Sequence, residues 1–449
     1  MKNHIFYCKF SHLSYNRLQF RSFLSFVCKG KGGRMAMKKQ KTLSILAAAF
    51  TVSALLAGCA GGGGGTGTQQ SGGETPAQNS GSGGGGGGGA TEKLVIAVVG
   101  PMSGQYSDYG STAKAGAEYA LKEKQEAFKQ LGFDVQLSSQ DDQADPKQGV
   151  AVAQMLISNP DVIGVVGHAT TGASVTAAAQ YDQEKLVMVS PSATGSDLTE
   201  QGKKIVHRIC ARDDQQGSKA AIYAKNSLNV KNAFIMHDKQ AYGQGLADEV
   251  KKQFEKDGVQ ILGYEGVTAG EKDYGAVLNQ ILATKPEMIY FGGYYSDAGI
   301  IVKQAREKGF TGIFMGGDGY DSADLVKIAG AENSNNVVFT STVGDVGATE
   351  EGKKWIADFE SATGNKVGIF TSFGYDSMGV MLHGLEEAIK ANGGKKPTRE
   401  QVLEAVHNIK DYKGKFVNVT FNEKGDNEFA SVYVYKYENG QKVYIGEAK

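Results

Sequence analysis

Cysteine is scarce in this sequence. Four cysteines occur in 449 residues, and three of them, Cys8, Cys28 and Cys59, lie within the first 60. Beyond residue 60 only Cys210 remains, and one cysteine can form neither an intramolecular disulfide nor a cysteine-based metal cluster. The main part of the chain is therefore predicted to fold without disulfide bonds, and we expect no metal site.

The short motifs of several enzyme classes are also missing. The sequence contains no G-x-x-x-x-G-K-[ST], no H-E-x-x-H, no G-x-S-x-G and no G-x-G-x-x-G after the first predicted strand. His168 lies close to Thr171, and a histidine beside a hydroxyl can act as the base for a nucleophile. A hydrolase that uses these two residues stays an alternative, although a histidine at a sheet end more often has a structural hydrogen-bonding role. We expect no catalytic residues and no cofactor.

Acidic residues are absent from the first 58, which hold ten lysines and arginines. The stretch 35–59 reads MAMKKQKTLSILAAAFTVSALLAGC, in which lysines precede a short apolar run and small residues precede the final cysteine. This pattern is typical of a secretion signal, because the apolar run is too short to span a membrane stably. We predict a signal peptide at residues 35–58 with translation starting at Met35 or Met37, and we interpret residues 1–34 as a wrongly assigned upstream extension.

The ending Leu-Ala-Gly-Cys resembles the lipobox of bacterial lipoproteins. This resemblance implies that Cys59 is acylated and becomes the first residue of the mature protein. Residues 60–90 are mostly Gly, Ser, Gln and Thr, which offer too little apolar surface to offset the entropy of the chain. We therefore expect residues 59–93 to be a lipid-bearing cysteine followed by a flexible linker, which would hold a folded body at the membrane.

Removal of residues 1–58 changes the net charge of the protein. It takes away ten basic residues and no acidic ones, which leaves 38 basic against 48 acidic side chains and a net charge of −10. Nucleic-acid-binding surfaces are basic. An acidic body argues against a nucleic-acid partner.

From Leu94 onward, short apolar runs alternate with segments of helical periodicity. The runs predicted to be strands are 94–100, 134–140, 162–167, 186–191, 232–238, 259–264, 287–293, 312–317 and 336–341. Helical patterns such as those at 113–130, 146–158 and 246–256 lie between them. Continuous apolar strands separated by helices are typical of parallel sheets covered on both faces. So many βα units indicate an α/β fold with two doubly wound parallel sheets.

Polar residues follow several of these predicted strands, and ligands of open parallel sheets bind outside the carboxyl ends of the strands. Thr170 and Thr171 follow one strand and open a helix, where hydroxyls and free N–H groups suit a carboxylate or a phosphate. An ordinary helix N-cap would use the same residue types. Ser192 and Thr194 follow the next strand. Asp318 lies in a glycine-rich turn, where it could meet a cation or form an Asx turn.

From Leu94 to the C-terminus the sequence resembles the leucine/isoleucine/valine-binding proteins of ABC importers. The matching stretches are IAVVGPMSGQYSDYG (96–110), DDQADPKQGVAVA (141–153), GHATTGAS (167–174), VSPSATGSDLT (189–199), HDKQAYGQGLA (237–247), TAGEKDY (268–274), YFGGY (290–294) and FMGGDG (314–319). The resemblance implies the type I periplasmic-binding fold, in which two doubly wound parallel-sheet lobes are joined by three crossover strands. It places lobe 1 at 94–211 plus 343–424 and lobe 2 at 212–342 plus 425–449.

The resemblance also implies which residues bind the ligand. Thr171 would hold the α-carboxylate of an amino acid, and Ser192, Thr194 and Asp318 would hold its α-ammonium. This acidic position is often glutamate in the family, so the shorter aspartate would change the depth of the pocket. The full set of implied ligand-binding residues is Tyr109, Thr170, Thr171, Ser192, Ala193, Thr194, Tyr242, Tyr294 and Asp318.

The function implied by the resemblance is that of an extracytoplasmic, lipid-anchored and monomeric receptor. It would bind leucine, isoleucine or valine between its lobes and deliver the amino acid to the permease subunits of an ABC importer, without catalysis. Within this class, the alternative is a receptor for another amino acid, an amide or an aromatic acid. From another class, the alternative is the hydrolase based on His168 and Thr171.

Overall fold

The computed structural model describes residues 91–449. The predicted upstream extension, signal peptide and acylated Cys59 all lie outside the described residues, as does the linker up to residue 90. The first strand begins at Glu92, two residues earlier than the apolar run predicts, because β1 (Glu92–Gly100) pairs with its neighbour from Glu92 onward.

The first lobe is built on a five-stranded parallel sheet in the order β2-β1-β3-β4-β5. Its other strands are β2 (Phe133–Asp141), β3 (Val162–Val166), β4 (Met188–Ser190) and β5 (Val206–Arg208). All residues of β1 from Leu94 onward are buried. A strand that is buried on both sides needs helices on both faces of the sheet.

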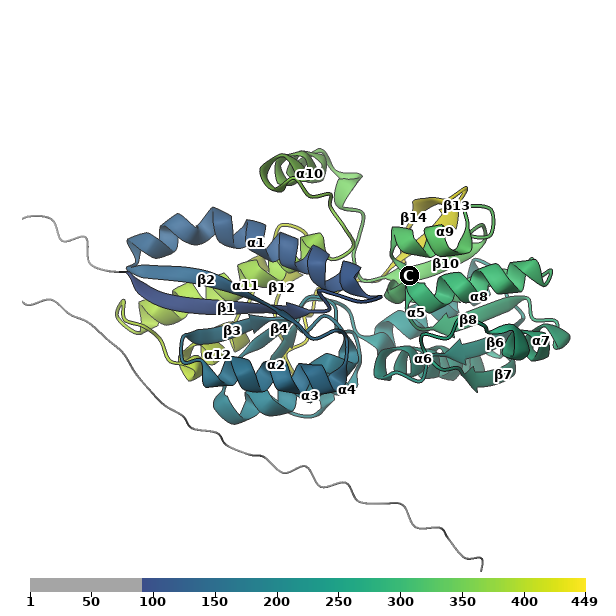
Figure 1. Cartoon of the computed structure of the whole chain (residues 1–449), viewed down its shortest axis with the longest axis horizontal. Helices are drawn as coiled ribbons and strands as arrows, with labels where there is room; N and C mark the ends of the chain where they lie inside the picture. The colour runs from purple at the N-terminus through teal and green to yellow at the C-terminus, as the bar shows by residue number, and fades with distance from the viewer. Residues whose placement is uncertain (1–90) are drawn as a thin grey trace, which may run out of the picture. The chain divides into compact units, whose positions relative to one another are not determined.

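Helices cover both faces of this sheet. They are α1 (Ser107–Gln130), α2 (Pro146–Ser158), α3 (Thr171–Tyr181), η1 (Asp182–Glu184), α4 (Asp197–Glu200), α11 (Thr371–Ala391) and α12 (Arg399–His407). Figure 1 shows α1 above the strands and α2 and α3 below them. Helix α2 begins where the sequence predicts, because the Asp145 carboxylate caps the N–H groups of Lys147 and Gln148 and Pro146 occupies the first turn.

The second lobe is built on a seven-stranded sheet in the order β14-β13-β10-β9-β8-β6-β7. Its strands are β6 (Asn232–His237), β7 (Gln260–Gly266), β8 (Met288–Gly292), β9 (Ile313–Gly316), β10 (Val337–Ser341), β13 (Tyr433–Glu438) and β14 (Gln441–Glu447). Its helices are α5 (Asp213–Asn226), α6 (Ala241–Asp257), α7 (Gly275–Ala283), α8 (Tyr295–Glu307), η2 (Asp318–Tyr320) and α9 (Ala323–Ala329).

The second sheet is not parallel throughout, which differs from the sequence prediction. Strands β6 to β10 are parallel, whereas β13 runs antiparallel to β10 and β14 antiparallel to β13. The two antiparallel strands form a hairpin whose turn residues, Asn439 and Gly440, both have positive φ. Asn-Gly is the preferred sequence for a two-residue hairpin turn of this kind.

The chain passes between the two sheets three times. The first crossover lies between β5 and α5, and the second follows β10. After it come η3 (Val346–Ala348), α10 (Glu350–Thr363), α11, α12, β11 (Tyr412–Lys413) and β12 (Asn418–Val419). The third crossover leads from β12 to β13. The predicted architecture of two doubly wound lobes joined by three crossovers is therefore confirmed.

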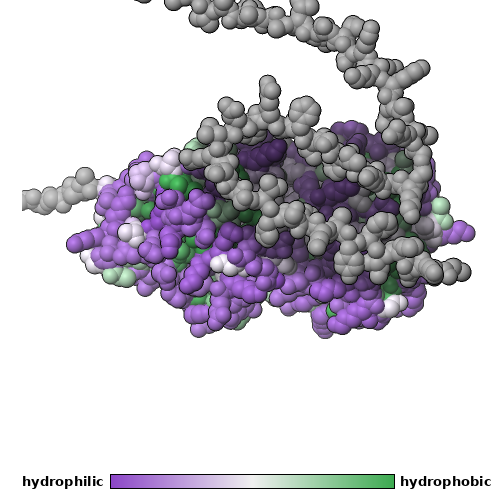
Figure 2. Space-filling model, turned by 90° about the horizontal axis from the view of Figure 1, so that it is seen from below, coloured by the Kyte–Doolittle hydropathy of each residue, from purple (hydrophilic) through white to green (hydrophobic). Residues whose placement is uncertain are grey.

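Polar residues dominate the surface, and apolar residues fill the interior. Figure 2 shows that the coloured part of one face is mostly hydrophilic, with hydrophobic residues scattered over it. Cys210 is buried. Among residues 91–449, no helix combines the length and the apolar character that a membrane crossing requires.

Candidate functional site

The topology of each sheet fixes where a ligand site can form. In lobe 1 the strand order reverses between β1 and β3, and in lobe 2 it reverses between β6 and β8. At such a point the connections after two neighbouring strands run to opposite sides of the sheet, which opens a crevice at the carboxyl ends of the strands. The first turns of the helices that follow these strands carry Tyr109, Thr171 and Tyr242, and Tyr294 is the N-cap of α8.

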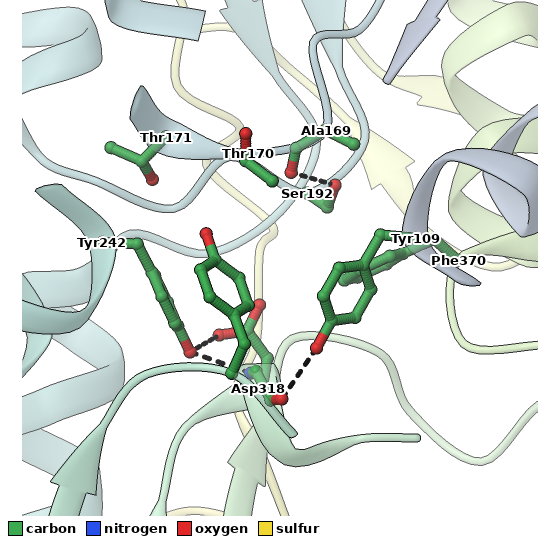
Figure 3. Close-up of a pocket in the computed structure, with 10 residues that line it drawn as sticks. Tyr109, Ala169, Thr170, Thr171, Ser192, Tyr242, Asp318 and Phe370 are labelled. Carbon is green, nitrogen blue, oxygen red and sulfur yellow. Dashed lines mark hydrogen bonds between the residues drawn. The ribbon is translucent and has the colours of Figure 1, made fainter. Parts of the chain in front are cut away.

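A cavity lies where these two crevices meet (Figure 3). Its volume is about 10 Å³, roughly the space of one water molecule. Ten residues line it: Tyr109, Ala169, Thr170, Thr171, Ser192, Tyr242, Tyr294, Asp318, Gly319 and Phe370. The site therefore combines hydroxyls, one carboxylate and aromatic rings from both lobes.

Thr171 provides the side of the site that suits an anion. It is the first residue of α3, so the free N–H groups of that helix lie beside it. Its Oγ1 accepts a hydrogen bond from the Gly195 N–H at 3.0 Å. Because this bond uses the hydroxyl only as an acceptor, its proton remains available for donation to a carboxylate.

Asp318 provides the opposite side of the site. Its Oδ1 accepts hydrogen bonds from the Tyr242 hydroxyl at 2.8 Å and from the Gln216 Nε2 at 3.0 Å. Gln216 also accepts from the Asp318 N–H at 2.8 Å. Burial raises the pKa of Asp318 to about 6, against the effect of these two donors. Within the described residues no group donates to Oδ2, so this oxygen is the one that can receive a cation.

A second buried carboxyl lies behind Asp318. Asp213 is 1 % exposed, and neither of its oxygens has a hydrogen-bond partner among the described residues. Burial and the neighbouring charge of Asp318 raise the pKa of Asp213 well above its usual value. Within residues 91–449 neither carboxyl forms an ion pair with a lysine or arginine, so this end of the site can accept a positively charged group.

Aromatic rings form the remaining wall. The ring of Tyr109 lies 5.7 Å from that of Tyr294 and 5.4 Å from that of Phe370, and the Tyr242 and Tyr294 rings are 5.0 Å apart. Such rings bury a large apolar area at low entropic cost. This wall therefore suits an apolar group.

The two lobes touch through hydrogen bonds at one edge of the site. The Tyr109 hydroxyl donates to the Gly319 carbonyl at 2.7 Å, and the Tyr295 hydroxyl donates to the Gln105 carbonyl at 2.6 Å. Farther out, the Ser322 hydroxyl donates to the Asp108 Oδ2 at 2.8 Å. Each of these bonds joins the segment at the start of α1 to lobe 2.

The structure brings most of the predicted site residues together. Seven of the nine line the cavity: Tyr109, Thr170, Thr171, Ser192, Tyr242, Tyr294 and Asp318. Ala193 and Thr194, which are both fully buried, do not line it. The Ala193 carbonyl accepts from Arg208, and the Thr194 carbonyl accepts from the Asp213 N–H.

Three residues that line the cavity were missing from the prediction. Gly319 directly follows Asp318, and Ala169 directly precedes Thr170, so both could have been found from the predicted strand ends. Phe370 is the N-cap of α11, far along the chain from the other residues, and no local pattern in the sequence marks it.

The histidine of the hydrolase alternative lies outside the cavity. His168 is fully buried; its Nδ1 lies 2.7 Å from the Asp142 Oδ2, and its Nε2 lies 3.0 Å from the Tyr181 hydroxyl. Both ring nitrogens are therefore engaged, and the base has no free nitrogen for Thr171. Among residues 91–449, no cluster of His, Cys, Asp or Glu is arranged to hold a metal ion.

The chain is similar to known proteins over most of its length. A family model described as periplasmic binding protein matches residues 93–442. An amino acid binding protein of Pseudomonas aeruginosa is 33% identical over 78% of this chain and 91% of its own length. A leucine-, isoleucine-, valine-, threonine- and alanine-binding protein of the same organism is 31% identical over 77% of this chain and 90% of its own.

Two solved structures share the fold. A leucine-binding protein of Thermotoga maritima has a TM-score of 0.72 at 28% identity, covering 79% of this chain and 99% of that protein. A branched-chain amino acid transporter substrate-binding protein of Streptococcus pneumoniae, in complex with isoleucine, has a TM-score of 0.71 at 25% identity with the same coverage. Both the type I periplasmic-binding architecture and the predicted family resemblance are thereby confirmed.

Proposed function

This chain belongs to the periplasmic binding protein family, and we propose that it is the extracytoplasmic receptor of an ABC importer for leucine, isoleucine or valine. The observation that carries this proposal is the opposition of Thr171 and Asp318 across one aromatic-walled cavity. An α-amino acid has a carboxylate, an ammonium and a side chain on one carbon. The site offers one matching group for each.

Each end of the amino acid meets a group of the right character. The carboxylate lies at the start of α3, where the Thr171 hydroxyl and the free N–H groups donate to it. The ammonium lies against Asp318, whose Oδ2 accepts from it while Oδ1 stays bound to Tyr242 and Gln216. The aliphatic side chain packs on the rings of Tyr109, Tyr294 and Phe370.

Binding requires the lobes to move. A cavity of about 10 Å³ cannot hold an amino acid, which is several times larger than a water molecule. The ligand enters when the lobes part, and contacts from both lobes then favour closure around it. The crossover segments supply the bend, with residues 94–211 plus 343–424 moving as lobe 1 and residues 212–342 plus 425–449 as lobe 2.

The receptor is anchored at the membrane, beside the importer that it serves. Acylation at Cys59 anchors it, the segment from residue 60 to the first strand tethers it, and the permease subunits of the importer are its partners. It acts as a monomer and makes or breaks no bond. Incorporation of labelled fatty acid tests the anchor: Cys59→Ala should abolish labelling and release a protein that still binds its ligand.

Calorimetry with the common amino acids tests the ligand. Leucine, isoleucine and valine should bind with one site per chain, and the keto acid that matches leucine should bind much more weakly because it lacks the ammonium. Preferred binding of a different amino acid or of an amide would keep the receptor role and replace the ligand. Turnover of an ester or amide substrate would contradict the receptor role itself.

A further inference from the structure

Arg208 is a fully buried cation outside the ligand cavity. It is the last residue of β5, and its side chain is 0 % exposed. A guanidinium in such a place needs all its N–H groups bonded, because burial of an unpaired charge is costly. Its partners therefore show what the residue holds in place.

The first set of partners is the loop between β4 and α4, residues 191–196. Arg208 Nη1 donates to the carbonyls of Ala193 at 2.9 Å and Gly195 at 2.8 Å. The Thr194 carbonyl between them accepts from the Asp213 N–H at 2.9 Å. Three consecutive carbonyls of this loop are thus fixed by the two residues that flank the first crossover, Arg208 before it and Asp213 after it.

This loop forms part of the ligand site. Ser192 lines the cavity, and the Gly195 N–H donates to the Thr171 Oγ1. The latter bond makes the Thr171 hydroxyl an acceptor there and so directs its proton elsewhere. The orientation of the loop therefore decides what Thr171 presents to a ligand.

The second partner of Arg208 is Asp426, which lies on the third crossover. Arg208 Nε donates to the Asp426 Oδ1 at 2.6 Å, and Arg212 Nη1 donates to the Asp426 Oδ2 at 3.0 Å. The Thr199 hydroxyl bridges the pair, since it accepts from Arg208 Nη2 at 2.5 Å and lies 3.0 Å from the Asp426 Oδ1. Burial opposes ionisation of Asp426, but the two arginines keep its pKa below the usual value.

Arg212 extends these contacts to the second lobe. It is the N-cap of α5, the first helix of lobe 2. The carboxylate of Asp426 thus joins the first crossover to the third beside β5, at the edge of the first sheet. These segments must bend when the lobes close.

We propose that Arg208 and Asp426 are positioning residues for ligand binding. Arg208 holds the loop 191–196 in the orientation that the ligand needs, and Asp426 ties Arg208 to the two crossovers whose bending closes the lobes. The loop that meets the ligand and the hinge that closes over it are then parts of one bonded unit. This inference rests on the proposed function, because its readout is amino-acid affinity.

Asp426→Asn and Arg208→Lys test the proposal. Asp426→Asn removes the negative charge and Arg208→Lys removes the forked guanidinium, while both keep most of the side-chain shape. The dissociation constant for leucine should therefore rise on the order of tenfold in each variant. Lys424→Ala is the matched control. Lys424 lies on the same loop as Asp426, but it is exposed and pairs only with Glu200 among the described residues. The leucine affinity of this variant should stay at the wild-type value.

Two readouts separate positioning from mere stability. Binding is measured well below the unfolding midpoint of each variant, where a residue that only stabilises the fold would leave the dissociation constant unchanged. Hydrogen exchange then reports the loop directly: the Gly195 amide, bonded to Thr171, should exchange faster in both variants and not in Lys424→Ala. The double variant Asp426→Asn with Arg208→Lys should bind leucine about as tightly as the weaker-binding single variant, because both substitutions break the same set of hydrogen bonds.

If Asp426→Asn and Arg208→Lys do not fold, Thr199→Val tests the positioning role instead. It removes the bridging hydroxyl while keeping the shape, and leucine affinity should fall several-fold. Wild-type affinity in Thr199→Val, or in either charged variant that folds, would overturn the positioning role. Absence of amino-acid binding by the wild-type protein would instead contradict the proposed function.

Discussion

Asp318 is the residue at which a ligand's ammonium and a solvent proton compete for the same carboxylate. Burial raises its pKa to about 6 in the arrangement that the structure shows. Above that pH the carboxylate is ionised and ready for the ammonium. Below it, the ammonium must displace a proton, which weakens binding by up to tenfold for each pH unit.

Leucine affinity should therefore be nearly constant between pH 7 and 8 and should fall as the pH drops from 6 to 4.5. Calorimetry across this range measures the effect, and the number of protons released on binding should rise below pH 6. Asp318→Asn provides the control, because its weaker affinity should lack this pH dependence. A flat profile in the wild-type protein would mean that the ammonium does not contact Asp318.

The same buried carboxyl lowers the stability of the fold. Its pKa is about 6 in the folded chain against 3.8 as the ordinary value, so between these values the unfolded state loses the proton first. Stability therefore falls as the pH rises from about 4 to about 6 and stays lower above it. Asp318→Asn removes this loss.

Without leucine, Asp318→Asn should be more stable than the wild-type protein by about 3 kcal/mol at pH 7.5, with little gain at pH 4. Denaturant unfolding at the two pH values measures this difference. The variant should lose at least tenfold in leucine affinity, so function and stability should change in opposite directions. If Asp318→Asn and the wild-type protein had the same free energy of unfolding at both pH values, burial of the Asp318 charge would be contradicted.

At the scale of elements, glycines set how closely the helices approach the strands and one another. A Cβ on Gly243 of α6 would lie 2.5 Å from the Gly292 carbonyl at the end of β8, and one on Gly292 would lie 2.0 Å from the Gly243 carbonyl. Helix α6 therefore packs on β8 with backbone against backbone. This contact brings Tyr242, the residue before Gly243, to Asp318.

Gly243→Ala should push α6 away from β8, destabilise the fold by about 2 kcal/mol or more and weaken leucine binding through the displaced Tyr242. Gly245→Ala on the same helix is the matched control. A Cβ there would meet no atom within 4 Å, and alanine is the better helix former. Thermal unfolding and calorimetry on both variants make the comparison, and similar behaviour of the two would refute the packing argument.

The parts of the site that the sequence predicts are those that follow strands. Thr171, Ser192 and Asp318 each come after an apolar run, and parallel strands bring their carboxyl ends to one edge. Phe370 and Gln216 could not be predicted in this way. They belong to helices that reach the site from other parts of the chain, and periodicity shows which face of a helix is buried but not its partner.

Close helix packing places Phe370. A Cβ on Gly116 of α1 would lie 1.9 Å from the Thr371 carbonyl of α11, and one on Gly374 would lie 2.0 Å from the Ala113 carbonyl. These two helices therefore touch through their backbones and bring Phe370 beside Tyr109. The antiparallel direction of β13 and β14 could not be predicted for another reason, because a β-rich run does not show whether the neighbouring strand runs parallel or antiparallel to it.

At the scale of the whole molecule, we expect the hydrogen bonds between the lobes to contribute to ligand affinity without touching the ligand. Tyr295 does not line the cavity, yet its hydroxyl bonds to the Gln105 carbonyl of the other lobe. Loss of this bond should disfavour the closed arrangement by about 1 kcal/mol. A ligand that binds only the closed arrangement then loses affinity by the same free energy.

Tyr295→Phe should therefore weaken leucine binding by roughly twofold to tenfold, with unchanged thermal stability of the free protein. Small-angle scattering should show a smaller radius of gyration with leucine than without it for the wild-type protein, and a smaller difference at subsaturating leucine for the variant. Tyr264→Phe, which removes a hydroxyl bonded to Asp248 within one lobe, should change neither. Equal affinities of Tyr295→Phe and the wild-type protein would argue against closure as the source of affinity.

The three crossings of the chain also impose an order on its folding. Helix α11 packs against α1 and the first sheet, but it is synthesised only after every parallel strand of the second sheet. A growing chain that has reached β10 therefore leaves the backbone-contacting face of α1 uncovered, and β10 still lacks β13 at its side. Neither lobe is finished before the last hundred or so residues arrive, so the two lobes mature together and premature arrest leaves both with exposed apolar surface.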